Sequence, residues 1–506
     1  MILGRLRRLA PRLAAGLGGI AALSVLAPDV VLGHQLNATY TSRLPLAVYL
    51  TGAAIAVGLS FLFVLARDVR ATPPVPTGPG HLPPAVIRVV LRVVGLVAVA
   101  WIVVQGILGN TSSGSVAPLF LWVYGWVGVA LLSALVGPVW HFLDPFSTLH
   151  DLGAGLLRRL GVGAWTPADY PERLGRWPAT IGFVAIVWIE LVDAGGGPST
   201  LFVVIVGYTA FTLAMMAQFG RDTWRSNGET FSVWFRLLGR LAAYERVDED
   251  GRVRRRSFAS GLLEPGWSVA DAALAALGVG SILFDGLSQT QPFFDLFGAP
   301  ATLEETLLLF AWLGILVAAA IVLTRVVGIA ATGAGLLPIA VGYLIAHYLT
   351  YLLIDGQNIL VAISDPFQQG WDLFGTAFHQ ADGSWLPPGL VWTVQLAAVV
   401  GGHMLGAWGG HVNAVMHAPE GTDQRTIRRR EIPLAVVMVA LTTLTLWSLG
   451  QAILVAPPET PAASVIRSYD RDFTLATTLL NDSPRRPTSQ SGPASHGSAA
   501  PPTSRT

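Results

Sequence analysis

The chain has 506 residues, of which 52% are hydrophobic and 12% are charged. An average soluble protein has about 25% charged residues, so this composition indicates a protein surrounded largely by lipid. The formal net charge of +1 argues against nucleic acid as a partner, because concentrated positive charge is needed to bind the phosphate backbone. The sequence has no cysteine, which excludes disulfides, iron–sulfur clusters and thiolate metal sites. Any metal would be held by His, Asp, Glu, Met or backbone oxygens.

The first segment, residues 1–33, has the profile of a signal peptide. An arginine-rich region precedes an apolar run over 13–26, and the sequence up to Gly33 suits signal peptidase. Cleavage after Gly33 would leave His34 as the mature N-terminus outside the cytoplasm, where its amine and imidazole could together chelate copper. The alternative is an uncleaved anchor helix with His34 in a hydrated loop.

Further along, about ten segments are apolar and long enough to cross a bilayer, whose hydrocarbon core of about 30 Å requires about 20 residues per helix. The sequence therefore predicts an all-α fold, a polytopic bundle of membrane-spanning helices over residues 34–455. The predicted spans are 45–66, 86–108, 117–139, 178–195, 199–219, 268–287, 304–325, 333–355, 389–411 and 432–455.

Arginine in the loops predicts the orientation of these spans, since positive charge marks the cytoplasmic side. Arginines cluster in alternate loops, whereas the loops near residues 110, 196 and 290 and the loop 356–387 contain none. This pattern predicts a multi-pass plasma-membrane protein with its mature N-terminus and its C-terminus both outside the cytoplasm. The extracytoplasmic tail, 456–506, is poor in apolar residues from about 481 onward, which predicts disorder there.

Residues 221–266 form the largest predicted cytoplasmic segment. Large apolar residues recur in it at helical spacing beside arginines, namely Phe231, Trp234, Phe235, Leu238 and Leu241. That pattern is typical of a helix lying in the membrane interface. We therefore expect an interfacial segment there.

Ionisable groups inside predicted spans are candidates for function, because burying them in a bilayer costs several kcal/mol. The predicted substrate or ion pathway lies in the outer halves of the spans and consists of Glu190, Asp193, Asp285, His347, Tyr351 and Asp355. Oxygen and imidazole ligands suit hard or borderline metals, so Asp285 and His347, with His34, are candidate ligands for a divalent metal or copper. Alternatively, Asp193, Asp285 and Asp355 are solvated groups or caps at helix ends.

A second polar stripe, formed by Gln395, His403 and His411, descends the ninth of these spans toward the cytoplasm. A shared haem would need two histidines at similar depth in facing spans. At 1.5 Å per residue, His347 and His403 miss each other by about 10 Å. Haem is therefore not expected.

Several segments also carry a resemblance to a known family. They are Gly33-His34, YPERLGRWP with IEL, FGRDTWRSNGETF, FDGLSQT, IAHYLTYLLIDGQ, SDPFQQGWDLFGT and GGHMLG. Together they resemble a family of uncharacterised polytopic membrane proteins from high-GC bacteria. The resemblance implies the fold and the membrane location. The label fenitrothion hydrolase, which some members carry, implies cleavage of an organophosphate ester.

Three functions remain open at this point. The first is handling or translocation of a small solute, proton or metal ion through an outward-facing polar cavity. The second is a membrane-embedded metal-dependent hydrolase with His34 or His379 as further ligands, although the sequence has no Gly-x-Ser-x-Gly elbow, His-Glu-x-x-His motif or P-loop. The third is a non-catalytic subunit or assembly factor of a membrane complex, with 221–266 and 356–387 as docking surfaces.

Overall fold

The computed structural model describes residues 55, 58, 79–108, 116–161, 166–193 and 197–449. Within these residues the protein is mostly helical, and eight helical segments are long and apolar enough to cross a membrane. This confirms the predicted helical class, and the eight apolar helices support the prediction of a multi-pass membrane protein. The predicted signal or anchor segment 1–33, the predicted span 45–66 (apart from residues 55 and 58) and the tail 456–506 lie outside the described residues.

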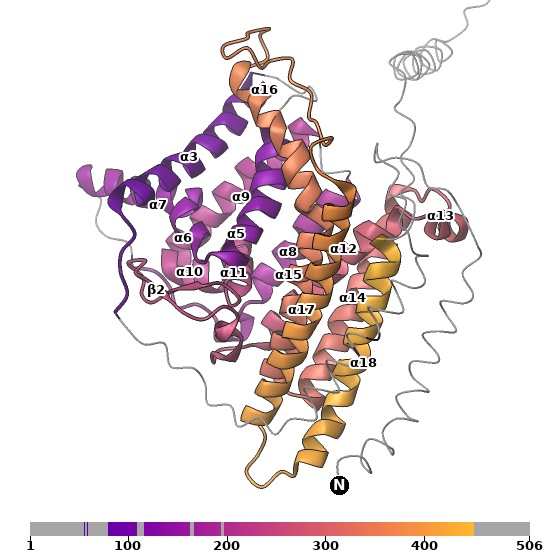
Figure 1. Cartoon of the computed structure of the whole chain (residues 1–506). Helices are drawn as coiled ribbons and strands as arrows, with labels where there is room; N and C mark the ends of the chain where they lie inside the picture. Colours follow the sequence, from indigo (N-terminus) through magenta and orange to yellow (C-terminus); the bar gives the residue numbers. More distant parts are fainter. Residues whose placement is uncertain are drawn as a thin grey trace, which may run out of the picture. The chain divides into compact units, whose positions relative to one another are not determined.

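The eight long segments follow the predicted spans closely. In chain order they are α3 (Ala85–Ile107), the continuous run of α4 (Val116–Pro118), η1 (Leu119–Gly128) and α5 (Val129–Leu135), α9 (Pro198–Phe219), α12 (Val269–Ser288), α14 (Thr302–Val326), the run of α15 (Ile329–Ile354), η4 (Asp355–Asn358) and α16 (Ile359–Ser364), α17 (Pro388–Met416) and α18 (Gln424–Leu449). Helices α12, α14, α15, α17 and α18 pack side by side (Figure 1).

The predicted span 178–195 corresponds to a shorter helix, α8 (Trp177–Leu191). Its 15 residues extend over about 22 Å, which is less than the hydrocarbon core of a typical bilayer. The remaining elements are α6 (Val139–Leu143), α7 (Pro145–Arg159), η2 (Glu172–Leu174), α10 (Arg221–Asn227), α11 (Thr230–Leu238), the antiparallel hairpin of β1 (Tyr244–Arg246) and β2 (Val253–Arg255), η3 (Ser260–Leu263) and α13 (Gln291–Phe297).

Burial distinguishes the central helices from those at the periphery. Nearly every residue of α12 from Ala270 to Phe284 is buried, as is most of α15. In contrast, α3 and α14 expose large apolar side chains, including Val86, Val90, Leu303 and Ile315. Helices that expose many large apolar side chains need a nonaqueous partner, and a bilayer supplies one.

Glycines bring the backbones of α15 and α17 into close contact. A Cβ atom on Gly342 would lie 2.4 Å from the carbonyl oxygen of Ala398, and one on Gly402 would lie 2.5 Å from that of Pro338. Small residues permit this approach between membrane helices, whose association depends on close packing because lipid gives no hydrophobic drive.

The segment 221–266 differs from the prediction of an interfacial helix. It contains α10, α11, the hairpin and η3, and the five apolar side chains on which the prediction rested are all buried within the protein. In α11, the Phe235 ring lies 5.2 Å from Trp140 of α6, and the Trp234 ring lies 5.0 Å from Phe183 of α8. An apolar stripe at helical spacing shows that a helix needs an apolar partner. Here that partner is protein.

We predict that Gly402→Ala lowers the free energy of unfolding by about 1–3 kcal/mol, because the new methyl group forces α15 and α17 apart. Thermal unfolding of the detergent-purified protein measures this loss. The matched control is Gly401→Ala on the same helix, where a Cβ meets no other side chain within 4 Å. Equal melting temperatures for the two variants would contradict the close contact.

Candidate functional site

A polar network connects three helices that pack together at one end of α12. Glu190 lies near the end of α8, Asp285 in the last turn of α12, and His347 and Tyr348 in α15. His347 Nε2 lies 2.8 Å from Asp285 Oδ2. The Tyr348 hydroxyl lies 3.0 Å from the same oxygen and 3.1 Å from Glu190 Oε1. These contacts form a continuous chain of ionisable groups, Glu190–Tyr348–Asp285–His347, which we call the polar network.

The hydrogen bonds of the polar network require that one of its carboxyl groups carries a proton. A tyrosine hydroxyl has a single proton to donate, yet the Tyr348 hydroxyl is within hydrogen-bonding distance of both carboxyl groups. Both contacts are hydrogen bonds only when one of the two carboxyl groups carries a proton of its own. Gln289 also donates to Asp285 Oδ1 at 2.6 Å, so Asp285 has several donors around it. The arrangement suits a proton that is shared along the chain.

The structure brings together three of the six residues of the predicted pathway, namely Glu190, Asp285 and His347. The Tyr351 ring packs near the Tyr348 ring, with centroids 6.4 Å apart. Among the described residues, no hydrogen bond connects Asp193 or Asp355 to the polar network.

Sequence reasoning did not select Tyr348 as a site residue. The residues selected in this span, His347, Tyr351 and Asp355, recur in steps of four, and Tyr348, directly after His347, falls outside that spacing. Tyr348 could have been found as a second polar residue beside a histidine in an otherwise apolar span. A residue in that position can reach a neighbouring helix that the residues spaced four apart do not face.

The predicted metal site finds no support in the described part of the chain. No group of three or more His, Asp or Glu side chains there is placed to hold a metal ion. Asp285 and His347 contact each other, and His34 lies outside the described residues. His379, the further ligand of the hydrolase hypothesis, contacts Gln357 Oε1 at 3.2 Å in the loop that follows α16.

The second polar stripe is split into separate contacts. Gln395 donates to the carbonyl oxygen of Ala346 in α15 at 2.8 Å. His403 Nδ1 lies 2.8 Å from the Val399 carbonyl of its own helix, and His411 Nδ1 lies 2.9 Å from Glu431 Oε1 of α18. Successive members are eight residues, or about 12 Å, apart along α17. Gln395 and His411 therefore join α17 to neighbouring helices, and the three side chains lie too far apart along the helix to contact one another.

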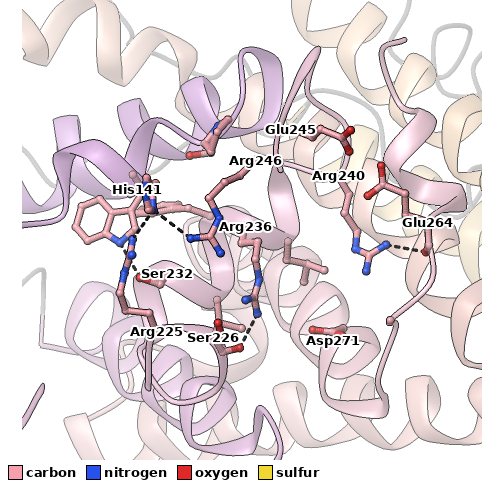
Figure 2. A pocket seen from close by; sticks show the side chains of 18 of the residues that line it. His141, Arg225, Ser226, Ser232, Arg236, Arg240, Glu245, Arg246, Glu264 and Asp271 are labelled. Carbon is pink, nitrogen blue, oxygen red and sulfur yellow. Dashed lines mark hydrogen bonds between the residues drawn. The ribbon is translucent and has the colours of Figure 1, made fainter. Parts of the chain in front are cut away.

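A second polar region lies at the other end of α12, and the sequence analysis did not identify it. It is a pocket with a volume of about 340 Å³, formed by α6, α10, α11 and the hairpin together with the start of α12 (Figure 2). We call it the arginine pocket, after the six arginines that line it, Arg176, Arg225, Arg236, Arg240, Arg246 and Arg256. It was missed because these residues come from separate segments whose convergence the sequence does not reveal.

His141 of α6 is a neutral hydrogen-bond acceptor in the arginine pocket. Its Nδ1 atom lies 3.2 Å from Arg225 Nη2 and 3.2 Å from Arg246 Nη1 (Figure 2). Because guanidinium groups only donate, Nδ1 must accept, and the ring cannot be doubly protonated there. Burial and the positive charges of Arg225 and Arg246 lower the pKa of His141 to about 3.

Comparisons with protein-family models, with curated proteins and with solved structures give no match to this chain.

Function is therefore inferred from the chemistry of the two polar regions. They lie far apart on one rigid helix, because Asp271 at the arginine pocket and Asp285 in the polar network are separated by 14 residues of α12, or about 21 Å.

Replacing Tyr348 by Phe should lower the free energy of unfolding by about 1–3 kcal/mol, since both carboxyl groups lose a hydrogen-bond partner. Thermal unfolding in detergent is the measurement. The control is Tyr351→Phe in the next turn of α15, whose hydroxyl takes no part in the polar network. A larger loss for Tyr351→Phe than for Tyr348→Phe would contradict the network.

The low pKa of His141 predicts a pH dependence of stability. As the pH falls below about 6.5, the unfolded chain binds a proton at this histidine that the folded protein does not bind until near pH 3. Folded-state stability should therefore decrease across this window, and His141→Gln, which offers an acceptor at any pH, should lose less. Melting temperatures measured from about pH 7 to about pH 4 test this. If the melting temperatures of the wild type and of His141→Gln fall equally with pH, His141 is not held neutral.

Proposed function

We propose that this chain is an integral membrane protein that relays protons through the polar network and couples them to the passage of a small solute or ion. The observation that carries this proposal is the continuous chain from Glu190 to His347 across three helices. Groups that exchange protons must contact one another directly or through water, and these do. Proton relays in membrane transport proteins are built from Asp, Glu and His in this way.

A purely structural role explains the polar network less well. The His411–Glu431 pair shows what a structural contact looks like in this protein, because both side chains are 5% exposed and they satisfy each other. In the polar network, the side chains of His347 and Asp285 are 17% and 15% exposed. In the proposed relay, this exposed area is where water meets the network and protons enter and leave.

The proposal includes an orientation in the plasma membrane. The arginine pocket would face the cytoplasm, since positive charge is retained on that side, and the polar network would lie toward the outside. Both termini of the mature chain would then be extracytoplasmic. The family resemblance described above is consistent with this location, and it remains part of the proposal.

Proton flux into vesicles tests the proposal. The purified full chain would be reconstituted into liposomes that contain a pH-sensitive dye, and a potassium diffusion potential would drive proton entry. We expect Glu190→Gln and Asp285→Asn to reduce the initial rate by about tenfold or more, as loss of a proton-transferring group does in acid–base chemistry.

The matched control is Tyr343→Phe, on the same helix as His347. It removes the 2.9 Å hydrogen bond between Tyr343 and Ser448 of α18 but leaves the polar network intact. Its rate should equal that of the wild type. Wild-type rates in both carboxyl variants would show that the polar network is not the proton pathway. No flux through the wild type, with or without added solutes, would remove the proposal altogether.

A further inference from the structure

Three of the six arginines in the arginine pocket have a carboxylate partner. Arg176 forms an ion pair with the buried Asp271. Arg225 Nε lies 3.0 Å from Asp144 Oδ2. Arg256 Nη1 lies 2.5 Å from Glu264 Oε1 and contacts Glu245 as well. The positive charges of these three arginines are compensated by the protein itself.

The other three arginines, Arg236, Arg240 and Arg246, have no carboxylate oxygen within 4.0 Å among the described residues. Arg236 donates to the carbonyl oxygen of Ser226 at 2.6 Å, and Arg246 contacts the neutral His141. Arg240 donates to three backbone carbonyls and lies 4.2 Å above the Trp267 ring. All three line the pocket, where Arg246 is directed toward His141, Arg236 toward Ser226 and Arg240 toward Glu264 (Figure 2).

Within the described part of the chain, none of these three arginines forms an ion pair, and each has both other arginines and carboxylates at longer range. The Arg236 side chain is open to the water of the pocket, yet protein surrounds it closely. That burial and the charges of Arg176, Arg246 and Arg240 lower the pKa of Arg236 to about 9. Like charges held near each other are unfavourable. The protein therefore maintains an arrangement that is costly when the pocket contains only water.

We propose that the arginine pocket binds the phosphate group of a small molecule or lipid between Arg236, Arg240 and Arg246. Planar guanidinium groups match phosphate oxygens in pairs. The charge of the lining has the matching sign. Six arginines and five acidic residues line the pocket, the acids being Asp222, Glu245, Glu249, Glu264 and Asp271, and the excess of positive charge suits the negative charge of a phosphate monoester.

The size of the pocket is consistent with such a ligand. Its volume of about 340 Å³ lies within the range of small-molecule sites, about 300–1,000 Å³. A soluble phosphate ester and the head group of an anionic phospholipid present the same chemistry to these arginines. This site is distinct from the polar network and does not depend on the proton-relay proposal.

Calorimetric titration of the full chain with inorganic phosphate, in neutral detergent at low salt, is the first arm of the test. We expect saturable binding to the wild type that weakens by about tenfold or more in Arg236→Gln and in Arg246→Gln, since each removes a charge-assisted hydrogen bond. The matched control is Arg255→Gln, an exposed arginine of β2 that does not line the pocket. It should bind phosphate as the wild type does.

The second arm separates the two sources of phosphate. The protein would be reconstituted into phosphatidylcholine vesicles with and without phosphatidic acid, purified again, and the retained lipid measured by mass spectrometry. Retention of phosphatidic acid by the wild type and by Arg255→Gln, but not by Arg236→Gln, assigns the site to a lipid head group. Phosphate binding without such retention assigns it to a soluble ester.

Thermal stability measured without phosphate shows whether the variants are folded. Removing an uncompensated charge should leave the melting temperature of Arg236→Gln equal to or above that of the wild type, while phosphate raises only the wild-type value. A phosphate effect that is the same in the wild type and in both pocket variants would overturn the proposal. Absence of both phosphate and phosphatidic acid binding to the wild type would overturn it equally.

Discussion

The close backbone contact between α15 and α17 is the constraint on which the rest of the structure depends. Gly342 and Gly402 leave no room for a side chain between the two helices, so the two backbones are in direct contact. Gln395 of α17 adds a hydrogen bond to the carbonyl of Ala346, directly before His347 and Tyr348. The contact therefore places the imidazole and the hydroxyl of the polar network at a defined distance from α8 and α12.

Helix α12 connects the two polar regions because it carries an acidic residue near each end. Asp271 completes a capping box with Ser268 and pairs with Arg176 at the arginine pocket, and Asp285 accepts hydrogen bonds in the polar network. The apolar, buried residues between them keep water out of the middle of the helix. A protein that passes protons or solutes in a controlled manner needs such a barrier between two accessible polar ends.

Much of the fold was predictable from the sequence, whereas the details of the polar sites were not. Long apolar segments reveal spans because a bilayer imposes a minimum length, and Glu190 and His347 stand out because they interrupt apolar runs. The side chains around Trp234 pack against other helices of the protein, and the sequence could not show this because hydrophobic spacing does not identify the partner that covers a helix face. Arg225 has a carboxylate partner, whereas Arg246 has none within 4.0 Å among the residues that the structure describes. This difference depends on side-chain geometry, which a linear pattern does not contain.

Topology accounts for where the arginines lie but not for how they are arranged. The positive-inside rule requires only that positive charge be present in the loops of one side, and exposed residues such as Arg159 and Arg255 meet that requirement at little cost. Arg236 and Arg246 instead line a pocket in which other arginines are close. Holding like charges near one another without a paired counter-ion is unfavourable. Since their positions are not required for orientation, the cost of placing them there is best explained by an anion that compensates their charge.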